Sequence, residues 1–479
     1  MFSQYDFASG FDEMFDEQGE IRKHYQKIYD QLLEMGQSEL VEIKTSMQDY
    51  MMKQGVTFTL YSGEQGNSLE RTIPVDIIPR VIPTDEWTLI EKGVKQRVMA
   101  INQFIRDVYH EQVILREGII PRKMVVSNPY FLTEMMGVKV PGDVYIPLAG
   151  IDLIRDDKGQ YFVLEDNLRT PSGLSYIYKN RTWMKRLFQD LMTNHNVRPI
   201  DKSLDSLLTI LRSLSPTNKK DPIVVLLTPG CYNSAYFEHT FIAQQLGIPL
   251  VEGKDLKVIN QKVYMKTIKG LQQVDVVYRR VDDEFLDPLC FRADSVLGVP
   301  GIMNAYRAGN VAIANAPGTG IADDKAMYTY VPDMIRFYLN EEPILNNIPT
   351  YVLAREKDLQ YVLAHLPEMV VKETALSGGY GMLIGPCSTE QEITEFRQKI
   401  IKDPAKYIAQ PTINLSSVPS LVRDGVQGRH VDLRPFAFMG VNEIEVLPGG
   451  LTRVALKEGS LVVNSSQGGG SKDTWVLNY

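Results

Sequence analysis

The stretch from Gly150 to Tyr176 constrains the fold more than any other part of the chain. It begins GIDLIRDDKGQYFVLEDN, and we predict a β-hairpin with strands at 151–154 and 160–165 joined by a turn over residues 155–159. Aromatic and branched residues fill the second strand, which ends at an acidic and amide run, residues 165–167. Such a turn brings Asp152, on the first strand, back alongside that run.

Two carboxylates and one amide carbonyl would then converge, from Asp152, Glu165 and Asn167. A small set of hard oxygen ligands suits a Mg²⁺ ion that keeps some waters and shares phosphate oxygens. The same residues also fit a polar strand end that leads into a Pro-Ser-Gly turn, because acidic clusters at strand ends are common. Spacing alone leaves both interpretations open.

Length and charge restrict the class of protein. A chain of 479 residues exceeds one ordinary core, and typical domain sizes suggest about three units or one composite enzyme. The formal net charge of −8 argues against nucleic acid or an anionic membrane as the main partner. Three cysteines without a CxxC pair predict a reducing cytoplasm, and six histidines without HExxH spacing disfavour a histidine metal site. We find neither a signal peptide nor a run of about 18 apolar residues.

The N-terminal part reads as structural. Helical periodicity runs from Glu20 to Gly55, a short strand is expected at 57–61, and prolines keep residues 72–83 extended. Thr84 is expected to cap a long helix that reaches about Gln112. Further helices are expected near 182–194 and after Arg198, followed by a polar linker at 215–221 that suggests a domain boundary.

Residues 222–258 have a βαβ pattern. A buried strand at 223–227, a turn, a helix at 235–246 capped by Gly247 and a second strand at 249–251 indicate a parallel sheet. Ligands often bind at the carboxyl ends of such strands, and the candidates there are Tyr232, Asn233, Ser234 and Glu238. A third strand at 274–278 ends in Arg279 and Arg280, which suit an anion but equally suit the acidic residues 282–284. An ordinary βα loop remains the alternative.

Two glycine-rich loops lie further along the chain. The first, ANAPGTGIADDKA, leads into a helix predicted at Asp323 and places Lys325 in its first turn, where a bound phosphate would explain a lysine. The second follows a strand at 369–374 that carries Lys372 and Glu373, and a strand resumes at 382–384. A short strand then ends at Gln410, and an alternating strand from His430 puts Asp432 and Arg434 on one face. The glycine cluster that runs from Ser465 to Trp475 is compatible with a flexible tail, and its Lys472, Asp473 and Trp475 are equally compatible with an ordered loop.

Several long phrases together resemble the circularly permuted ATP-grasp proteins, in particular those labelled glutathionylspermidine synthase-like. The resemblance covers roughly residues 73–479. It is carried by VYIPLAGIDLIRDDKGQYFVLEDNLRTPSG, LLTPGCYNSAYFEHTFIAQQLGIPLVEG, YRRVDDEFLDP, GIADDKAMYTYVPDMIRFYL, VVKETALSGGYGMLIGP and VVNSSQGGGSKDTWVL. In an ordinary ATP-grasp chain the magnesium hairpin follows the nucleotide lid, whereas here it precedes the lid, which is the order that a permuted family implies.

The resemblance implies an α/β fold. Its parts are an N-terminal helical region (1–70), a first part of the ATP-grasp core with the metal hairpin (71–215), an inserted Rossmann-like pre-ATP-grasp βαβ domain on the substrate side (216–320), and the lid with the rest of the core (321–479).

Residue roles carry over by position. Asp152, Glu165 and Asn167 match the Mg²⁺ ligands, and Lys325 and Lys372 match the two nucleotide-phosphate lysines, with Glu373 beside the second. The flexible loop over the phosphates corresponds to Ser377, Gly378, Gly379, Tyr380 and Gly381, and the hinge against adenine begins at Gln410. Either Arg169 or Arg434 is similar to the arginine that steadies the transferred phosphoryl group. Candidate substrate residues are Tyr232, Asn233, Glu238, Arg279 and Arg280.

The implied chemistry is an ATP- and Mg²⁺-dependent ligation of a carboxylate to an amine, through an acylphosphate, on a peptide-like or polyamine-like substrate. Such a reaction needs charge neutralisation and in-line positioning rather than a side-chain nucleophile. This agrees with the lack of any Ser-His-Asp or Cys-His constellation. The alternatives are an ATP-binding partner protein without ligase turnover and a phosphotransferase.

Overall fold

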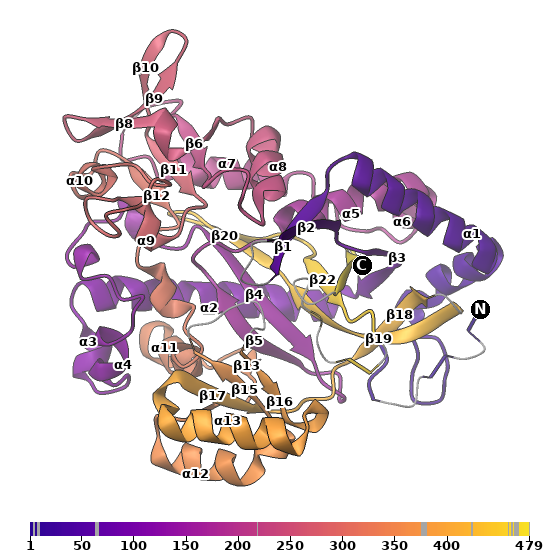
Figure 1. The fold of residues 1–479 in the computed structure, drawn as a ribbon. Helices are drawn as coiled ribbons and strands as arrows, with labels where there is room; N and C mark the ends of the chain where they lie inside the picture. Colours follow the sequence, from indigo (N-terminus) through magenta and orange to yellow (C-terminus); the bar gives the residue numbers. More distant parts are fainter. Residues whose placement is uncertain are drawn as a thin grey trace.

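One large mixed sheet forms the centre of the computed structural model (Figure 1). The structure describes residues 1–2, 5–6, 10–62, 67–217, 219–374, 381–422, 425–457, 459–460, 463 and 469–478. The main strand order is β13-β5-β4-β19-β22-β23-β3, with β18 beside β19 and the β20–β21 pair beside β4. These strands are β3 (Val75–Ile82), β4 (Leu148–Arg155), β5 (Tyr161–Asn167), β13 (Asn346–Asn347), β18 (Ser417–Val422), β19 (Gly425–Arg434), β20 (Phe436–Met439), β21 (Ile444–Val446), β22 (Leu451–Val454) and β23 (Gly470–Val476).

The predicted hairpin is confirmed as β4 and β5. The two strands pair antiparallel, and the register sets Asp152 opposite Glu165 and Gly150 opposite Asn167. Gly159 takes the left-handed conformation that the turn requires, with φ of 79°. A bulge after Asp152 shifts the register by one residue, so that Leu153 lies opposite Val163.

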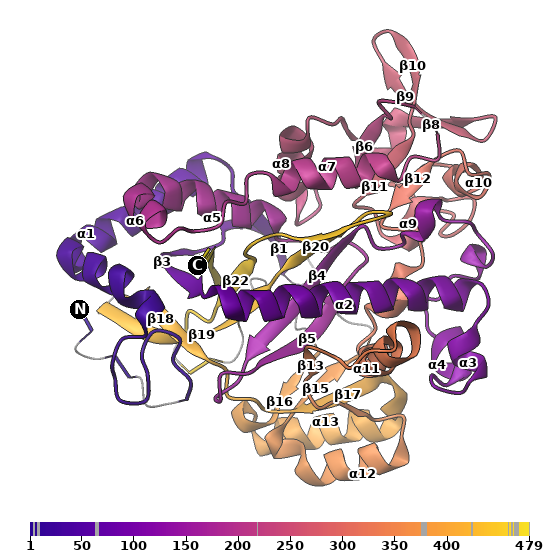
Figure 2. The same cartoon turned by 180° about the vertical axis from the view of Figure 1, so that it is seen from behind.

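The helix α2 (Thr84–Tyr109) runs along one side of the sheet (Figure 2). Its apolar positions at helical spacing, including Ile90, Val94, Ile101 and Phe104, are fully buried against the core. Thr84 was expected to cap this helix, but that prediction is wrong: Pro83 occupies the cap position, and the Thr84 hydroxyl donates instead to the carbonyl of Leu477 at 2.7 Å.

Apart from α1, the other helices and strands before residue 215 are shorter than α2. The helix α1 is interrupted at Gly36, which has φ of 74°. They are α1 (Gln26–Lys53), the hairpin of β1 (Thr57–Ser62) and β2 (Asn67–Thr72), α3 (Val113–Arg116), α4 (Arg122–Val126), α5 (Leu174–Leu187), α6 (Gln189–Asn194) and α7 (Ser203–Ser213). Within the described part of the chain, no helix has the length and apolar character that crossing a membrane requires.

The predicted βαβ segment forms a second, parallel sheet with the order β12-β11-β6-β7. Gly247 ends its first helix in the left-handed conformation, as expected. An antiparallel sheet of β8 to β10 projects from this unit (Figure 1). The elements are β6 (Val224–Leu227), α8 (Tyr236–Leu246), β7 (Leu250–Val251), β8 (Leu256–Ile259), β9 (Lys262–Thr267), β10 (Gly270–Gln273), β11 (Val276–Arg279), α9 (Asp283–Leu286), α10 (Ile302–Arg307) and β12 (Ala312–Ala314).

A third unit is an antiparallel sheet in the order β14-β17-β15-β16, covered by α12 and α13 (Figure 1). The predicted strands on either side of the second glycine loop are confirmed as β15 and β16. The elements are α11 (Val331–Met334), β14 (Tyr351–Val352), α12 (Glu356–His365), β15 (Met369–Glu373), β16 (Leu383–Ile384), α13 (Glu390–Lys402) and β17 (Tyr407–Pro411). We refer to residues 350–411 as the lid unit.

Two other expectations are wrong. No helix begins at Asp323; a 3₁₀ turn covers Thr319–Ala322, and the Asp324 carboxylate accepts from the backbone N–H groups of Ala326 and Met327 in a further turn. The helix-dipole argument for Lys325 therefore does not apply. Residues 470–476 are neither a tail nor a loop, because they form β23 inside the central sheet with every residue buried, while residues 465–468 of the glycine cluster lie outside the described residues.

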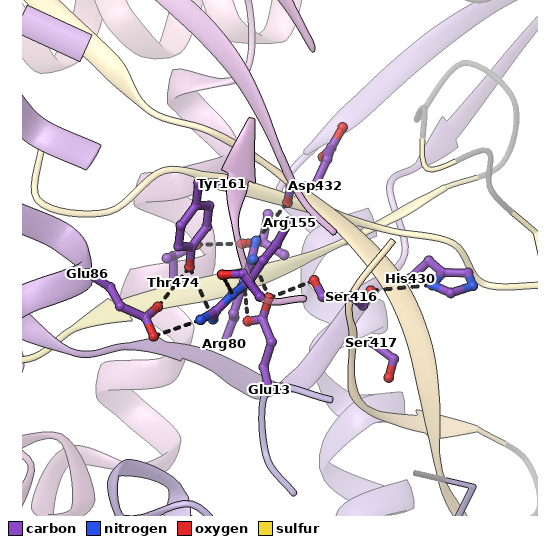
Figure 3. Close-up of polar contacts among 12 residues, drawn as sticks. Glu13, Arg80, Glu86, Arg155, Tyr161, Ser416, Ser417, His430, Asp432 and Thr474 are labelled. Atoms are coloured by element: carbon purple, nitrogen blue, oxygen red, sulfur yellow. Dashed lines mark hydrogen bonds and ion pairs between the residues drawn. The ribbon is translucent and has the colours of Figure 1, made fainter. Parts of the chain in front are cut away.

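A buried polar network ties the N-terminal segment to the sheet (Figure 3). The guanidinium of Arg80 grips Glu13 through two hydrogen bonds of 2.6 and 2.7 Å, and Ser416 donates to the same carboxylate at 2.8 Å. Both members of the ion pair are 1% exposed. Burial acts to raise the pKa of Glu13, yet Arg80 and Arg155 hold it below its ordinary value.

We predict that Glu13→Gln lowers the free energy of unfolding by about 3–5 kcal/mol, because it leaves the buried Arg80 charge without its anion. Urea unfolding followed by tryptophan fluorescence measures the change. The exposed Glu17→Gln is the matched control and should unfold like the unsubstituted protein. An equal midpoint for both variants would contradict the structural role of this pair.

Candidate active site

The sequence-predicted hairpin ends at a cluster of buried charges. Asp152 on β4 is fully buried, and its two carboxylate oxygens accept from Arg434 on β19, one of them at 2.7 Å. Arg453 on β22 donates to the same carboxylate at 2.6 Å and also to Asp432. Burial acts to raise the pKa of Asp152, but Arg434 and Arg453 hold it well below its ordinary range. In this arrangement Asp152 is the counter-ion that fixes two arginines.

The acidic run at the end of β5 divides between two faces of the strand. Asp166 points to the buried Arg97 of α2, with hydrogen bonds of 2.6 and 2.7 Å. Arg97 in turn donates to Asn347 at 2.7 Å. Glu165 lies on the opposite face with 30% of its side chain exposed, and its carboxylate is 3.9 Å from Arg434. The period of two along a strand explains why neighbouring carboxylates serve different purposes.

Asn167 shares the face of Glu165 and has an unsatisfied polar atom. Its side-chain nitrogen is buried and has no hydrogen-bond partner within the described structure. The oxygen and nitrogen of an amide are told apart by their hydrogen-bond partners, so with no partner here the side chain can equally be turned to place its oxygen, a metal ligand, at this position. Glu165 and Asn167 therefore fit a Mg²⁺ ion completed by water and phosphate oxygens, whereas both oxygens of Asp152 are occupied by arginines. Among the described residues, no cluster of three or more His, Cys, Asp or Glu is placed to hold a metal.

The lid unit presents Lys372 to this cluster. Its ammonium donates to the Gln410 side chain at 2.8 Å, and Gln410 donates to Thr350 at 3.0 Å. Burial lowers the pKa of Lys372 to about 8; Glu165 and Asp152 act to raise it, and Lys325 acts to lower it further. The charges that act on Lys372 are therefore those of the hairpin and of the other predicted phosphate lysine.

The other predicted lid residues are placed around Lys372. The backbone of Lys325 donates to the carbonyl of Thr374 at 3.4 Å, which brings that segment to the end of β15. Glu373 pairs with Tyr407 on β17. Gly381 is exposed with φ of 67°. Ser377, Gly378, Gly379 and Tyr380 lie outside the described residues.

The two candidate arginines have different surroundings. Arg434 lies among Asp152, Glu165 and the carbonyl of Ser172. Arg169 instead lies 3.6 Å from Asp282 and 3.7 Å from Asp323, over the ring of Tyr130. Burial raises the pKa of Asp323 to about 7, against the effect of Arg169. The structure therefore groups Arg434, rather than Arg169, with the hairpin cluster.

Three of the predicted substrate residues are buried and hold the backbone, and two lie nearer the surface. Glu238 and Arg280 are a buried pair, 3.3 Å apart, that holds the segment 171–175: Glu238 accepts from the backbone of Gly173 and Ser175, and Arg280 donates to the carbonyl of Pro171. Arg279 is fully buried; it donates to the carbonyls of Asn315, Val281 and Ala316 and pairs with Asp283. Tyr232 is 85% exposed, and Asn233 is half-buried at the start of α8.

Sequence reasoning missed Arg453, Arg97 and Asn315. Arg453 and Arg97 are buried cations whose partners, Asp152 and Asp166, lie far away in the chain. Asn315 connects β12 to the hairpin, since its amide donates to the carbonyl of Leu148 at 2.6 Å and accepts from the Leu148 N–H. The one available signal was a lone arginine within an apolar strand, as in LTRVAL, because such a charge needs an anion.

Comparison with known proteins gives a consistent picture. Residues 79–455 match the sequence model of a family described as circularly permuted ATP-grasp type 2. An uncharacterized Synechocystis protein is 52% identical, with 99% of this chain and 98% of that protein aligned. An uncharacterized Mycobacterium tuberculosis protein is 51% identical over 98% of this chain and 84% of its own length.

Two further matches carry descriptive names. A Frankia alni protein provisionally named glutamate–cysteine ligase 2-3 is 38% identical over 98% of this chain and 54% of that protein. The solved structure of a glutathione synthetase-like effector from Globodera pallida, in its apo form, has a TM-score of 0.57 and 13% identity. It covers 92% of this chain and 98% of the effector, and it is a likeness of fold.

We predict that Asp166→Asn destabilises the protein by about 3–5 kcal/mol, because Arg97 then lies buried without an anion. Thermal and urea unfolding measure the effect. Asp157→Asn, an exposed substitution in the hairpin turn, is the control and should leave the unfolding midpoint unchanged. If both variants are equally stable, the Arg97–Asp166 pair does not hold the hairpin to α2.

Proposed function

Since the chain belongs to the circularly permuted ATP-grasp family of type 2, we propose that it is an ATP-dependent carboxylate–amine ligase. In this reaction a substrate carboxylate attacks the γ-phosphate of ATP, the bond from that phosphorus to the bridging oxygen of ADP breaks, and an acylphosphate forms. An amine then displaces phosphate and leaves an amide. The provisional ligase names of the Frankia relatives support an amino-acid or peptide-like substrate.

The observation that carries this proposal is the convergence of charges on Lys372. The backbone of Lys325 donates to the carbonyl of Thr374, two residues after Lys372, so both predicted phosphate lysines lie at the end of β15. Glu165 and Asp152 of the hairpin act to raise the pKa of Lys372, and Lys325 acts to lower it. Cations from the lid facing acidic oxygens from the core are suited to bind a nucleotide triphosphate between them. This grouping supports nucleotide binding where the lid unit meets the hairpin.

We assign Glu165 and Asn167 to holding Mg²⁺, with waters and phosphate oxygens as the other ligands. When bound, the ion would neutralise charge on the phosphates. Asp152 acts on the site indirectly, because it fixes the position of the Arg434 guanidinium. Arg434 then faces the site as a preorganised cation, and we assign to it the stabilisation of the transferred phosphoryl group.

Lys325 and Lys372 are assigned to the nucleotide phosphates. Gln410 is buried and holds Lys372 in place through its side-chain oxygen, in addition to the hinge role expected from its position. The three free cysteines, Cys231, Cys290 and Cys387, fit a reducing compartment, and we place the reaction in the cytoplasm.

The test combines Mg-ATP with pools of amino acids, short peptides and amines. We expect ADP and phosphate to accumulate only when an acid and an amine are both present. Phosphorylated product without an amine would point to a phosphotransferase, and nucleotide binding with no turnover in any pool would point to a partner protein. Both results would refute the ligase.

We predict that Glu165→Gln reduces ADP release at least about 100-fold while the unfolding midpoint stays unchanged, because the side chain is partly exposed and aimed at the site. ADP release and a melting curve check the two parts. Asp166→Asn is the neighbouring comparison, since it should lose stability instead. Normal turnover in the Glu165 variant would remove the metal assignment.

The pKa of about 8 for Lys372 predicts a pH dependence. Below pH 8 the ammonium is charged and attracts phosphate, so nucleotide affinity should fall by up to about tenfold as pH rises from 7 to 9. In the unfolded chain the lysine has its ordinary pKa of about 10.4, so between pH 8 and 10 it binds more protons than in the folded protein. The contribution of this group to the free energy of unfolding therefore increases as pH rises through that window. Titration calorimetry with an ATP analogue at each pH measures the affinity. Lys372→Arg should remove the decline, and an unchanged decline would assign it to another group.

A further inference from the structure

A polar cavity of about 390 Å³ lies outside the hairpin cluster, where α1, α5 and α8 meet. Figure 1 shows α8 next to α5, and their aromatic side chains Tyr176 and Phe237 are in contact. The loop that follows β6 contributes Cys231, Asn233 and Ser234 to the cavity wall, and loops after parallel strands commonly bind ligands. Amides and hydroxyls supply much of its wall, namely Gln54, Thr57, Asn233, Ser234, Thr240 and Gln244.

One positive charge dominates the cavity. Of the described residues that line it, Lys179 is the only one that is charged. The ammonium lies 5.4 Å from the ring centre of Phe241 and 6.0 Å from that of Phe237, and it forms no salt bridge within the described structure. Aromatic faces steady an ammonium without cancelling its charge. The cavity runs along one side of α8, whose residues from Tyr236 to Gln244 form part of its wall.

The cavity is connected to Arg434 through one short segment. The Ser172 carbonyl accepts from Arg434 at 3.1 Å, the backbone of Gly173 and Ser175 is fixed by Glu238 of α8, and α5 then leads to Lys179. Two residues at their greatest reach and a helical rise over five more set an upper limit of about 15 Å on the span from Ser172 to Lys179. An extended peptide of about four residues covers the same length.

We propose that this cavity binds the free C-terminal carboxylate of a short peptide substrate, with Lys179 as its partner and the amides and hydroxyls as partners of the peptide bonds. This proposal rests on the proposed ligase function and names its substrate class. A polyamine needs acidic partners, which the described lining does not provide, whereas a carboxylate matches the one cation, Lys179, beside amide and hydroxyl donors. The remote end of the substrate then contributes binding energy that positions its reacting end.

Cys231 provides a direct readout, because it lines the cavity and is exposed. Cys387, exposed on the lid unit, is the internal control. The full chain is treated with N-ethylmaleimide without ATP, and peptide mapping follows the modification of each cysteine. Cysteine-free tetrapeptides are added as a pool with free C-terminal carboxylates or as the same pool of C-terminal amides. Turnover plays no part in this measurement, so it can fail independently of the ligase assay.

The free-acid pool, at about twice its dissociation constant, should slow modification of Cys231 about threefold and leave Cys387 unchanged. The amide pool should require about tenfold higher concentration. Lys179→Gln should erase the difference between the pools, and Lys179→Arg should retain it. Equal protection by both pools, no protection by either, or stronger protection by spermidine would overturn the proposal.

Discussion

The paired arginines around Asp152 are the interaction on which the rest of the site depends. Asp152 comes from β4, Arg434 from β19 and Arg453 from β22, so three neighbouring strands are joined by one buried carboxylate. The buried carboxylate of Asp152 is tolerated because both of its oxygens accept hydrogen bonds from arginine. Removing either arginine would leave its charge only partly compensated in a medium of low dielectric constant. The same pairing holds the Arg434 guanidinium rigid, with Glu165 3.9 Å away.

The parallel-sheet unit is fastened to this cluster by hydrogen bonds to backbone rather than by a large apolar surface alone. Asn315 forms hydrogen bonds with the backbone of Leu148 at the start of the hairpin. Glu238 and Arg280 form hydrogen bonds with the backbone of Gly173 and Pro171, in the segment that follows Arg169. Residues that looked like ligand contacts in the sequence therefore also position the chain. A shift of α8 would be transmitted to Arg434, since Glu238 bonds the backbone of Gly173, and the neighbouring Ser172 carbonyl accepts from Arg434.

Local patterns predicted those features that depend on local chemistry. The hairpin, its register and the cap at Gly247 follow from turn residues and alternation, so they were accessible from sequence. The pairing of Asp152 with Arg453 was not, because nothing near either residue signals a partner 301 positions away. The expected helix at Asp323 failed because the Asp324 side chain satisfies the backbone of a turn in its place. Glycine, lysine and aspartate near residue 472 suggested a loop, yet Asp76 and Arg181 neutralise Lys472 and Asp473 inside the sheet.

The position of β23 has a consequence for synthesis on the ribosome. This strand inserts in parallel beside β3, and the buried contact between Lys472 and Asp76 joins residues 396 positions apart. Until β23 has been made, the edge of β3 that pairs with it stays open, and Asp76, which also accepts from the N–H groups of Ile78 and Leu421, lacks the ammonium of Lys472. Such an open edge can pair with other nascent chains, so the protein depends on β23 to end a period of vulnerability to aggregation.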